Sequence, residues 1–225
     1  MGTLFIVSTP IGNLDDISAR ALGTLGKVSI IFAEDTRRTG KLLQHFGINI
    51  PLKSYHEHNV EKTIPYVISS LQDGAVALVS DSGTPLISDP GFKLVREVIG
   101  LGGKVVSVPG ASALLTALVV SGLPTDKFSF RGFPPKKSGQ LRKEFELVSD
   151  REETIIYYES PYRITKTLSA IKEILGEDRK VVVARELTKL HEEIFRGTVN
   201  EVLEILLHRG KIKGEIVLMI AKARF

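Results

Sequence analysis

An apolar run at residues 75–80 passes into a long polar loop, V-S-D-S-G-T-P-L-I-S-D-P-G at 79–91. A connection that only reverses the chain needs about two to six residues, whereas this one contains two aspartates, three serines and a threonine. Parallel α/β sheets bind their ligands at the carboxyl ends of their strands. The loop therefore predicts a binding site. An elaborate helix cap, with Asp89 and Pro90 beginning the next helix, is the alternative interpretation.

The first half of the chain alternates short apolar runs with amphipathic segments. We expect strands at 3–9, 29–33, 75–80 and 104–108, and helices after residue 15 and at 39–46, 61–71, 90–101 and 111–120. The strand at 29–33 is almost entirely apolar, which is typical of a strand buried on both faces of a parallel sheet. Residues 1–122 are therefore predicted to form a doubly wound parallel-sheet α/β domain.

Composition and charge both change across Gly122–Thr125, so we place the domain boundary there. The second α/β domain, 125–225, is expected to have strands at 128–133, 154–158, 180–184, 193–196 and 215–221, and helices at 140–148, 162–175 and 200–208. The last two strands flank a helix and are expected to run antiparallel to the others. The second sheet is therefore predicted to be mixed.

Composition excludes several classes of protein. The 225 residues are 43% hydrophobic and 25% charged, with no apolar run of about 18 residues that would span a bilayer, so we expect no membrane association and a cytoplasmic location. The absence of cysteine excludes disulfides, thiolate nucleophiles and iron–sulfur clusters. The first strand is not followed by G-x-G-x-x-G, and there is no P-loop motif. No metal site is predicted, because His56 and His58 are two residues apart on a loop and no carboxylate triad is evident nearby.

Polar clusters occur wherever a predicted sheet strand ends. They lie at 9–13, 34–37, 80–84 and 109–113 in the first half, and at 159–163 and 185–189 in the second. Each alone could be a salt-bridged cap. Because the carboxyl ends of parallel strands meet at one edge of a sheet, we expect them together to form a cleft between the domains.

All of the net charge of +4 lies in the second half of the chain. It is densest in a stretch without acidic residues that contains Arg131, Lys136, Lys137, Arg142 and Lys143. Such a stretch suits a polyanion, since neutralising phosphates releases condensed counterions. The alternative interpretation is a solvated helix face preceded by a basic turn.

Six motifs occur in one order across residues 2 to about 220: T-P-I-G-N-L, A-E-D-T-R, S-D-S-G-T-P-L-I-S-D-P-G, V-P-G-A-S-A, Y-E-S-P-Y-R and R-E-L-T-K. In this combination the chain resembles the tetrapyrrole methylase superfamily. The runs A-E-D-T-R, S-Y-H-E-H-N and G-F-P-P-K-K resemble its branch that methylates a cytidine ribose 2′-oxygen in small-subunit (16S) ribosomal RNA. The resemblance implies a two-domain α/β methyltransferase, a homodimer, that binds S-adenosylmethionine in the interdomain cleft without a glycine-rich signature.

The resemblance also implies site residues. Contacts with the cofactor are expected from Pro10, Ile11, Asp81, Thr84, Ser112, Ala113, Tyr158 and Leu187. Asp35 or Glu34 is the candidate general base, with Arg37 or Lys189 fixing the ribose or phosphate. A structural network formed by Glu34, Asp35 and Arg37 is the alternative.

The expected partner is small-subunit ribosomal RNA or the assembled small subunit. It would be bound by the five cations of the 131–143 stretch, with Tyr55, Phe133 or Tyr162 stacking on an unpaired base. Two other functions stay open from the sequence alone. They are methylation of a small tetrapyrrole, which the lysine and arginine pairs argue against, and a non-catalytic RNA-binding module.

Overall fold

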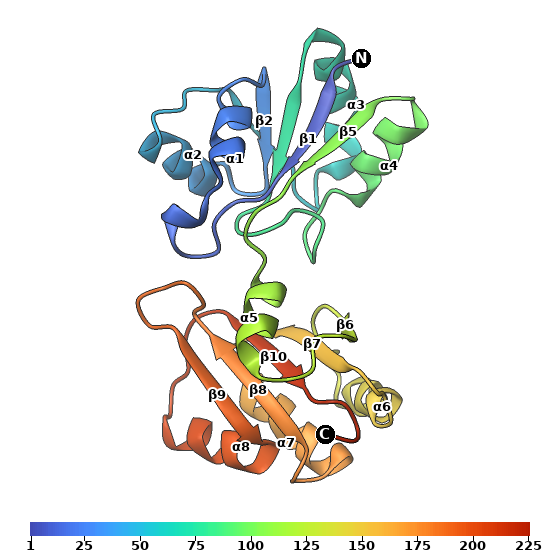
Figure 1. The fold of residues 1–225 in the computed structure, drawn as a ribbon. Helices are drawn as coiled ribbons and strands as arrows, with labels where there is room; N and C mark the ends of the chain where they lie inside the picture. Colours follow the sequence, from blue (N-terminus) through green and yellow to red (C-terminus); the bar gives the residue numbers. More distant parts are fainter. The chain divides into compact units, whose positions relative to one another are not determined.

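The computed structural model describes all residues, 1–225, as two compact units, 1–112 and 113–225 (Figure 1). No helix in either unit has both the length and the apolar character needed to cross a membrane.

The first unit is built on a five-stranded parallel sheet. Its strands are β1 (Thr3–Val7), β2 (Ile30–Ala33), β3 (Leu52–Ser54), β4 (Val76–Val79) and β5 (Lys104–Val108), in the order β3-β2-β4-β1-β5. Every residue of β2 and β4 is buried. The sheet is therefore covered on both faces, as the apolar run at 29–33 predicts.

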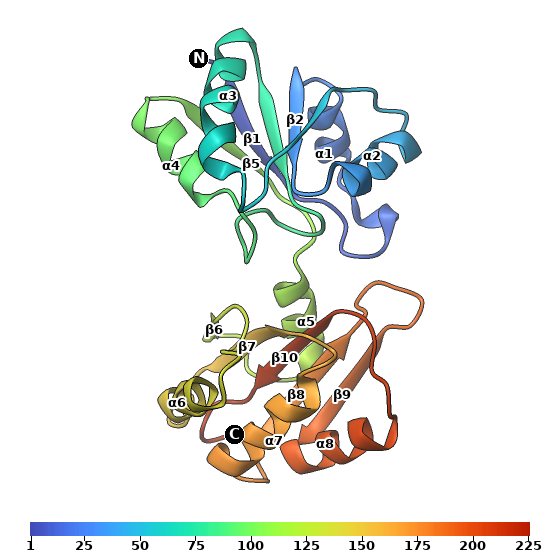
Figure 2. The same ribbon diagram turned by 180° about the vertical axis from the view of Figure 1, so that it is seen from behind.

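Helices cover each face of this sheet (Figures 1 and 2). The elements are a short 3-10 helix, η1 (Leu14–Asp16), and the α-helices α1 (Ala19–Leu25), α2 (Thr36–His45), α3 (Val60–Asp73) and α4 (Phe92–Gly100). One apolar core holds Leu25 of α1 and Leu43 of α2. A second core holds Leu71 of α3 and Leu94 of α4. The expected doubly wound parallel architecture is confirmed.

The second unit has a mixed five-stranded sheet. Its strands are β6 (Phe128–Phe130), β7 (Thr154–Glu159), β8 (Lys180–Arg185), β9 (Glu193–Thr198) and β10 (Ile216–Ile220), in the order β6-β7-β10-β8-β9. β6 is parallel to β7, whereas β10 is antiparallel to β7 and β8, and β9 is antiparallel to β8. The prediction that the last two strands make the sheet mixed is therefore confirmed.

One face of the second sheet packs against α6 (Ser138–Val148), α7 (Ile164–Leu175) and α8 (Val199–His208), which share one apolar core. The other face carries α5 (Ala113–Ser121), which packs against β7, β8 and β10 (Figure 1). Arg196 of β9 also donates hydrogen bonds to the carbonyls of Val120 and Ser121. These contacts assign α5 to the second unit, so the division falls at Ser112/Ala113, earlier than the expected boundary at 122–125.

Three local expectations differ from the structure. Strand β3, a three-residue edge strand with only Leu52 half-buried, is not among the expected strands. Helix α2 begins at Thr36, because the carboxylate of Asp35 accepts a hydrogen bond from the backbone of Arg37 and caps the helix. Helix α4 begins at Phe92 with Gly91 at the cap position, so Asp89 and Pro90 do not begin it.

Candidate functional site

Hydrogen bonds join the loops that follow β1, β4 and β5. Thr9 and Gly83 exchange backbone hydrogen bonds of 2.9 and 3.0 Å. The Thr84 hydroxyl accepts a hydrogen bond from the Ser8 hydroxyl and donates one to the carbonyl of Ala111, both at 3.1 Å. Thr84 therefore connects three strand ends. The structure thus brings together three of the polar clusters that the sequence places after strands.

The loop after β4 has a demanding backbone conformation. Leu86 and Ser88 have φ angles of 74° and 64°, which non-glycine residues rarely adopt. Gly91 has a φ of 144°, and a Cβ atom there would lie 2.7 Å from Cδ1 of Leu86. Such conformations persist only where surrounding contacts hold them, and they cluster at functional sites. The loop is therefore more than a helix cap.

The loop after β2 joins the same group through its backbone. The amide of Asp35 donates a 2.8 Å hydrogen bond to Oδ1 of Asp81. The Asp35 carboxylate accepts hydrogen bonds from the backbone, Nε and Nη2 of Arg37, at 2.9, 3.1 and 2.7 Å. These hydrogen bonds hold the pKa of Asp35 well below its usual range. Asp35 is therefore a helix cap paired with an arginine, and its carboxylate accepts protons poorly.

Two other carboxylates of the first unit behave in the opposite way. Burial, followed by the charge of Asp81, raises the pKa of Glu34. Burial, followed by the charge of Glu34, raises the pKa of Asp89 to about 6, although a hydrogen bond with Ser80 opposes the shift. Glu34, Asp81 and Asp89 therefore influence one another electrostatically. Carboxylates held this way favour a bound cation or a proton.

The loop after β8 in the second unit is also held tightly. Glu186 and Thr188 have positive φ angles of 52° and 66°, and Leu187 between them is buried. The Lys189 ammonium contacts Oε1 of Glu186 at 2.7 Å and Oε2 of Glu215 at 2.9 Å. Lys189 therefore stabilises the loop that presents Leu187, and its charge is already paired.

Residues 131–137, between β6 and α6, are braced from two sides. Arg131 pairs with Glu144 of α6 at 2.5 Å, and the Tyr157 hydroxyl donates to the same carboxylate. The Arg163 guanidinium donates hydrogen bonds to the carbonyls of Pro134 and Pro135, at 3.2 and 2.7 Å. These contacts therefore fix the position of residues 131–137 on the second unit.

The anchor of Arg163 is itself buried. Oε1 of Glu159 lies 3.6 Å from Nη1 of Arg163, and its side chain is fully buried. Glu159 also accepts hydrogen bonds from the Ser160 amide and the Thr167 hydroxyl. A buried carboxylate satisfied in this way fixes the position of its arginine.

The cations expected to bind a polyanion fall into two groups. Arg131 pairs with Glu144, and Arg142 pairs with Glu146 and Glu173. Lys136, Lys137 and Lys143 are exposed and have no ion-pair partner. The lysines, rather than the arginines, are therefore available to an external anion.

The three aromatic residues expected to stack on a base differ sharply in exposure. Tyr55 is completely buried in the first core, so that expectation was wrong. Phe133 and Tyr162 are 58% and 83% exposed. Tyr55 directly follows β3, and the neighbouring H-E-H run does not reveal that its side chain is buried. Phe133 and Tyr162 each adjoin a proline, which is compatible with their exposure.

The remaining sequence-predicted residues lie at strand ends. Pro10 and Ile11 follow β1 and are buried. Ile11 packs closely against Gly83: a Cβ atom added at Gly83 would lie 3.2 Å from Cγ2 of Ile11. Ser112 ends the first unit and Ala113 begins α5. Tyr158 is on β7 and packs edge-on against Phe130 and Phe133. The structure contains no group of three or more His, Cys, Asp or Glu side chains arranged to hold a metal ion.

Three features of the site were not predicted from the sequence. They are the hydrogen bond of Ser8, the raised pKa of Asp89, and the hydrogen bonds by which Arg163 holds Pro134 and Pro135. Ser8 is a buried polar residue at the end of an apolar strand, which is a detectable signal. The partners of Asp89 and Arg163 are set by tertiary structure, and no local pattern predicts them.

Residues 3–203 match the family described as Tetrapyrrole (Corrin/Porphyrin) Methylases. The chain is 49% identical to the Ribosomal RNA small subunit methyltransferase I of Bacillus subtilis, over 98% of this chain and 75% of that protein. It is 48% identical to the protein of the same name from Escherichia coli O157:H7, over 97% of this chain and 77% of that protein.

Solved structures share the fold at low sequence identity. The methyltransferase CobJ superposes with a TM-score of 0.73 at 16% identity, covering 99% of this chain and 95% of that chain. Diphthine synthase superposes with a TM-score of 0.72 at 14% identity, covering 98% of this chain and 90% of that chain.

Replacing Asp89 with asparagine is expected to stabilise the protein at neutral pH. The raised pKa means that the folded state binds this proton more tightly than the unfolded state, so stability falls as pH rises from 3.8 through about 6. Asparagine cannot ionise, so Asp89→Asn removes that loss. At pH values above about 6 the variant's free energy of unfolding should be higher by about 1–2 kcal/mol, after allowance for solvent screening. At low pH, where Asp89 is protonated, the substitution should have little effect. Calorimetric unfolding against pH measures the difference. A variant whose pH dependence matched that of the exposed control Asp73→Asn would contradict it.

Replacing Arg163 with alanine is expected to loosen the segment that contains Pro134 and Pro135. Losing two charge-assisted hydrogen bonds should speed tryptic cleavage after Lys136 and Lys137 roughly tenfold. The matched control is Arg179→Ala, because Arg179 likewise donates to two carbonyls, those of Ser149 and Ala221. Mass spectrometry of timed digests identifies the cleaved bonds. Equal rates of cleavage after Lys136 and Lys137 in the two variants would show that Arg163 does not hold this segment in place.

Proposed function

The chain belongs to the tetrapyrrole methylase family, and from this premise we propose that it transfers a methyl group from S-adenosylmethionine to the 2′-hydroxyl of a cytidine ribose in small-subunit ribosomal RNA. The observation that carries the proposal is near 50% identity, over almost the whole chain, to proteins named Ribosomal RNA small subunit methyltransferase I. The chain spans about three quarters of the length of these relatives. The low-identity structural neighbours support the fold alone.

The chemistry of the first unit fits a cationic cofactor. S-adenosylmethionine, when bound, supplies an electrophilic methyl group on a positively charged sulfur. Glu34, Asp81 and Asp89 bring three carboxylates to this edge of the sheet, where Nη1 of Arg38 lies 3.7 Å from Oδ2 of Asp81. Burial, with the charge of a neighbouring carboxylate, raises the pKa of Glu34 and of Asp89, which is the environment that a cation would favour. A cation at this edge would relieve that repulsion.

We assign cofactor binding to residues of both units. In the first unit they are Pro10, Ile11, Asp81, Thr84 and Ser112, and in the second Ala113, Tyr158 and Leu187. The support in the first unit is the hydrogen-bond network around Thr84, which fixes the loops after β1, β4 and β5. The buried Ile11 and Leu187 offer apolar surface suited to an adenine ring. Such pre-formed loops orient a ligand without further ordering cost.

Glu34 and Asp35 differ in their suitability as a general base. A ribose hydroxyl is a weak nucleophile, and a base that accepts its proton needs a pKa near the working pH. Burial moves the pKa of Glu34 in that direction, whereas the hydrogen bonds from Arg37 move that of Asp35 away from it. We therefore assign the base to Glu34 and a positioning role to Asp35.

The cations Arg37 and Lys189 take different roles as well. Arg37 is exposed and reaches solvent beside the cap of α2, where it could meet a phosphate. Lys189 is held by Glu186 and Glu215 and would act by fixing the loop that carries Leu187.

We assign RNA binding to the 131–143 stretch, with different weights for its members. Lys136, Lys137 and Lys143 would contact phosphates, while Arg131 and Arg142 hold the segment through their carboxylate partners. The substrate is the RNA or the assembled small subunit, and a cytoplasmic location belongs to the same proposal. A homodimer is supported by the exposed apolar side chains of α5, Leu115, Val119 and Val120.

The first test is transfer of labelled methyl from S-adenosylmethionine to small ribosomal subunits that lack the modification. Nuclease digestion and mass spectrometry are expected to place the label on a cytidine ribose. Transfer to RNA should fall steeply with salt, since phosphate contacts release counterions. Label on a base, or no label on RNA while the cofactor still binds, would reject the proposal and favour another substrate such as a small tetrapyrrole.

Glu34→Gln is expected to lower kcat by about 10²- to 10⁴-fold, because proton transfer is lost. Cofactor affinity should fall only modestly, because Asp81 and Asp89 keep their charges. Asp35→Asn should keep kcat within a few-fold, since asparagine also caps helices well. Kinetics from acid to neutral pH provide the second measurement: the acid limb of kcat/KM should disappear in Glu34→Gln. Equal losses in the two variants would contradict the assignment.

A further inference from the structure

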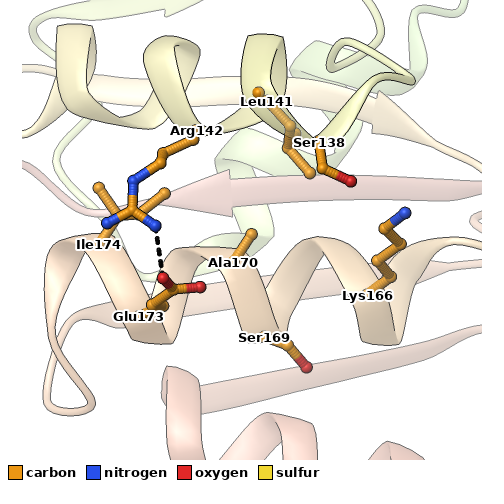
Figure 3. A pocket seen from close by; sticks show the side chains of 9 residues that line it. Ser138, Leu141, Arg142, Lys166, Ser169, Ala170, Glu173 and Ile174 are labelled. Carbon is orange, nitrogen blue, oxygen red and sulfur yellow. Dashed lines mark hydrogen bonds and ion pairs between the residues drawn. The ribbon is translucent and has the colours of Figure 1, made fainter.

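A pocket of about 390 Å³ lies between α6 and α7 of the second unit (Figure 3). Its floor is apolar, formed by Leu141, Ala170 and Ile174, which belong to the core or pack against it. Its rim is polar, with Ser138 from α6 and Ser169 from α7. Pockets that hold small ligands combine an apolar base with a few polar groups in this way, at volumes of about 300–1,000 Å³.

The two ends of the pocket differ in charge. At one end Arg142 pairs with Glu173 at 2.5 Å, which neutralises both side chains and closes the groove (Figure 3). At the other end lies Lys166, on the same side as Ser138 (Figure 3). Lys166 is exposed and has no hydrogen-bond or ion-pair partner. The pocket therefore carries one free positive charge at its open end.

The charged end of the pocket lies toward the carboxyl ends of β6 and β7. Each helix follows one of these parallel strands, so α6 and α7 both begin at that end of the sheet. Ser138 is the first residue of α6, and Lys166 is the third of α7. The unpaired Lys136 and Lys137 immediately precede α6. Lys166 therefore lines this end of the pocket, and Lys136 and Lys137 lie within two residues of Ser138, which also lines it.

We propose that this pocket receives one unstacked nucleotide of the RNA substrate, with its base against Leu141, Ala170 and Ile174 and its phosphate at Lys166. This inference rests on the proposed function, which makes RNA the partner. Charge complementarity favours it, because Lys166 offers a free ammonium group at the open end and the floor offers apolar surface to a flat ring. Single-stranded RNA is bound by this combination of stacking surface and cations.

Lys166 is thereby an RNA contact outside the 131–143 stretch, and the Arg142–Glu173 pair sets the length of the pocket. A duplex would not use the floor, because its bases stay stacked. An acidic protein segment would use the lysines alone.

Fluorescence anisotropy with a labelled single-stranded oligoribonucleotide, and with the same strand in a duplex, tests the proposal on the full chain. Lys166→Ala is expected to weaken single-strand binding about tenfold and to reduce the salt slope by about 1, with Lys166→Arg restoring both. Ser169→Trp, which fills the pocket from its exposed rim, should weaken single-strand binding about tenfold and leave duplex binding unchanged.

Two matched controls isolate the pocket. Lys180→Ala removes an exposed lysine at the opposite end of the same sheet, and Ser169→Ala removes the hydroxyl without filling the space. Both should bind as the unmodified protein does, and unchanged thermal midpoints in all variants exclude unfolding. Equal weakening of single strand and duplex by Ser169→Trp, or unchanged binding in both pocket variants, overturns the proposal.

Methyl transfer to small subunits by the unmodified protein, measured in parallel, separates the two proposals. Transfer that proceeds while pocket variants bind normally rejects the pocket alone. If no transfer occurs, the proposed function fails, and the oligoribonucleotide measurements still decide whether the pocket binds RNA.

Discussion

The architecture of the first unit depends on the connection between Thr9 and Gly83. Their paired backbone hydrogen bonds continue the contact of β1 and β4 beyond the sheet, where parallel strands would otherwise diverge into separate loops. Thr84 then connects this pair to β5, and Asp81 connects it to the loop after β2. The strained conformations of Leu86 and Ser88 follow directly after this fixed segment of the loop.

The sequence predicts most of the fold, because its signals are local and strong. The apolar runs at β2 and β4 indicate buried parallel strands, and the late antiparallel strands indicate a mixed sheet. The short edge strand β3 could not be predicted, because three residues are too few to show an alternation of apolar and polar side chains. Helix α5 was grouped with the preceding strand because its uniformly apolar sequence shows no preferred face, so its packing on the second sheet could not be inferred.

The site is predicted less completely, because side-chain partners are chosen by tertiary structure. Asp35 and Glu34 are neighbours of similar chemistry, yet Arg37 lowers the pKa of one and burial raises that of the other. A count of positive charges likewise treats Arg131 and Lys136 alike, although only the lysine lacks a carboxylate partner. Lys166, twenty-eight residues beyond Ser138 in the chain, lines the same pocket only through the packing of α6 against α7.

The carboxylates around Asp81 have a consequence for turnover. Methyl transfer converts a positively charged sulfonium into a neutral thioether, so with the cofactor bound as proposed, the used cofactor would lose the electrostatic attraction of Glu34, Asp81 and Asp89. The repulsion among these carboxylates returns at the same moment. Such an edge of the sheet would bind the donor more tightly than the by-product, and we expect it to limit product inhibition.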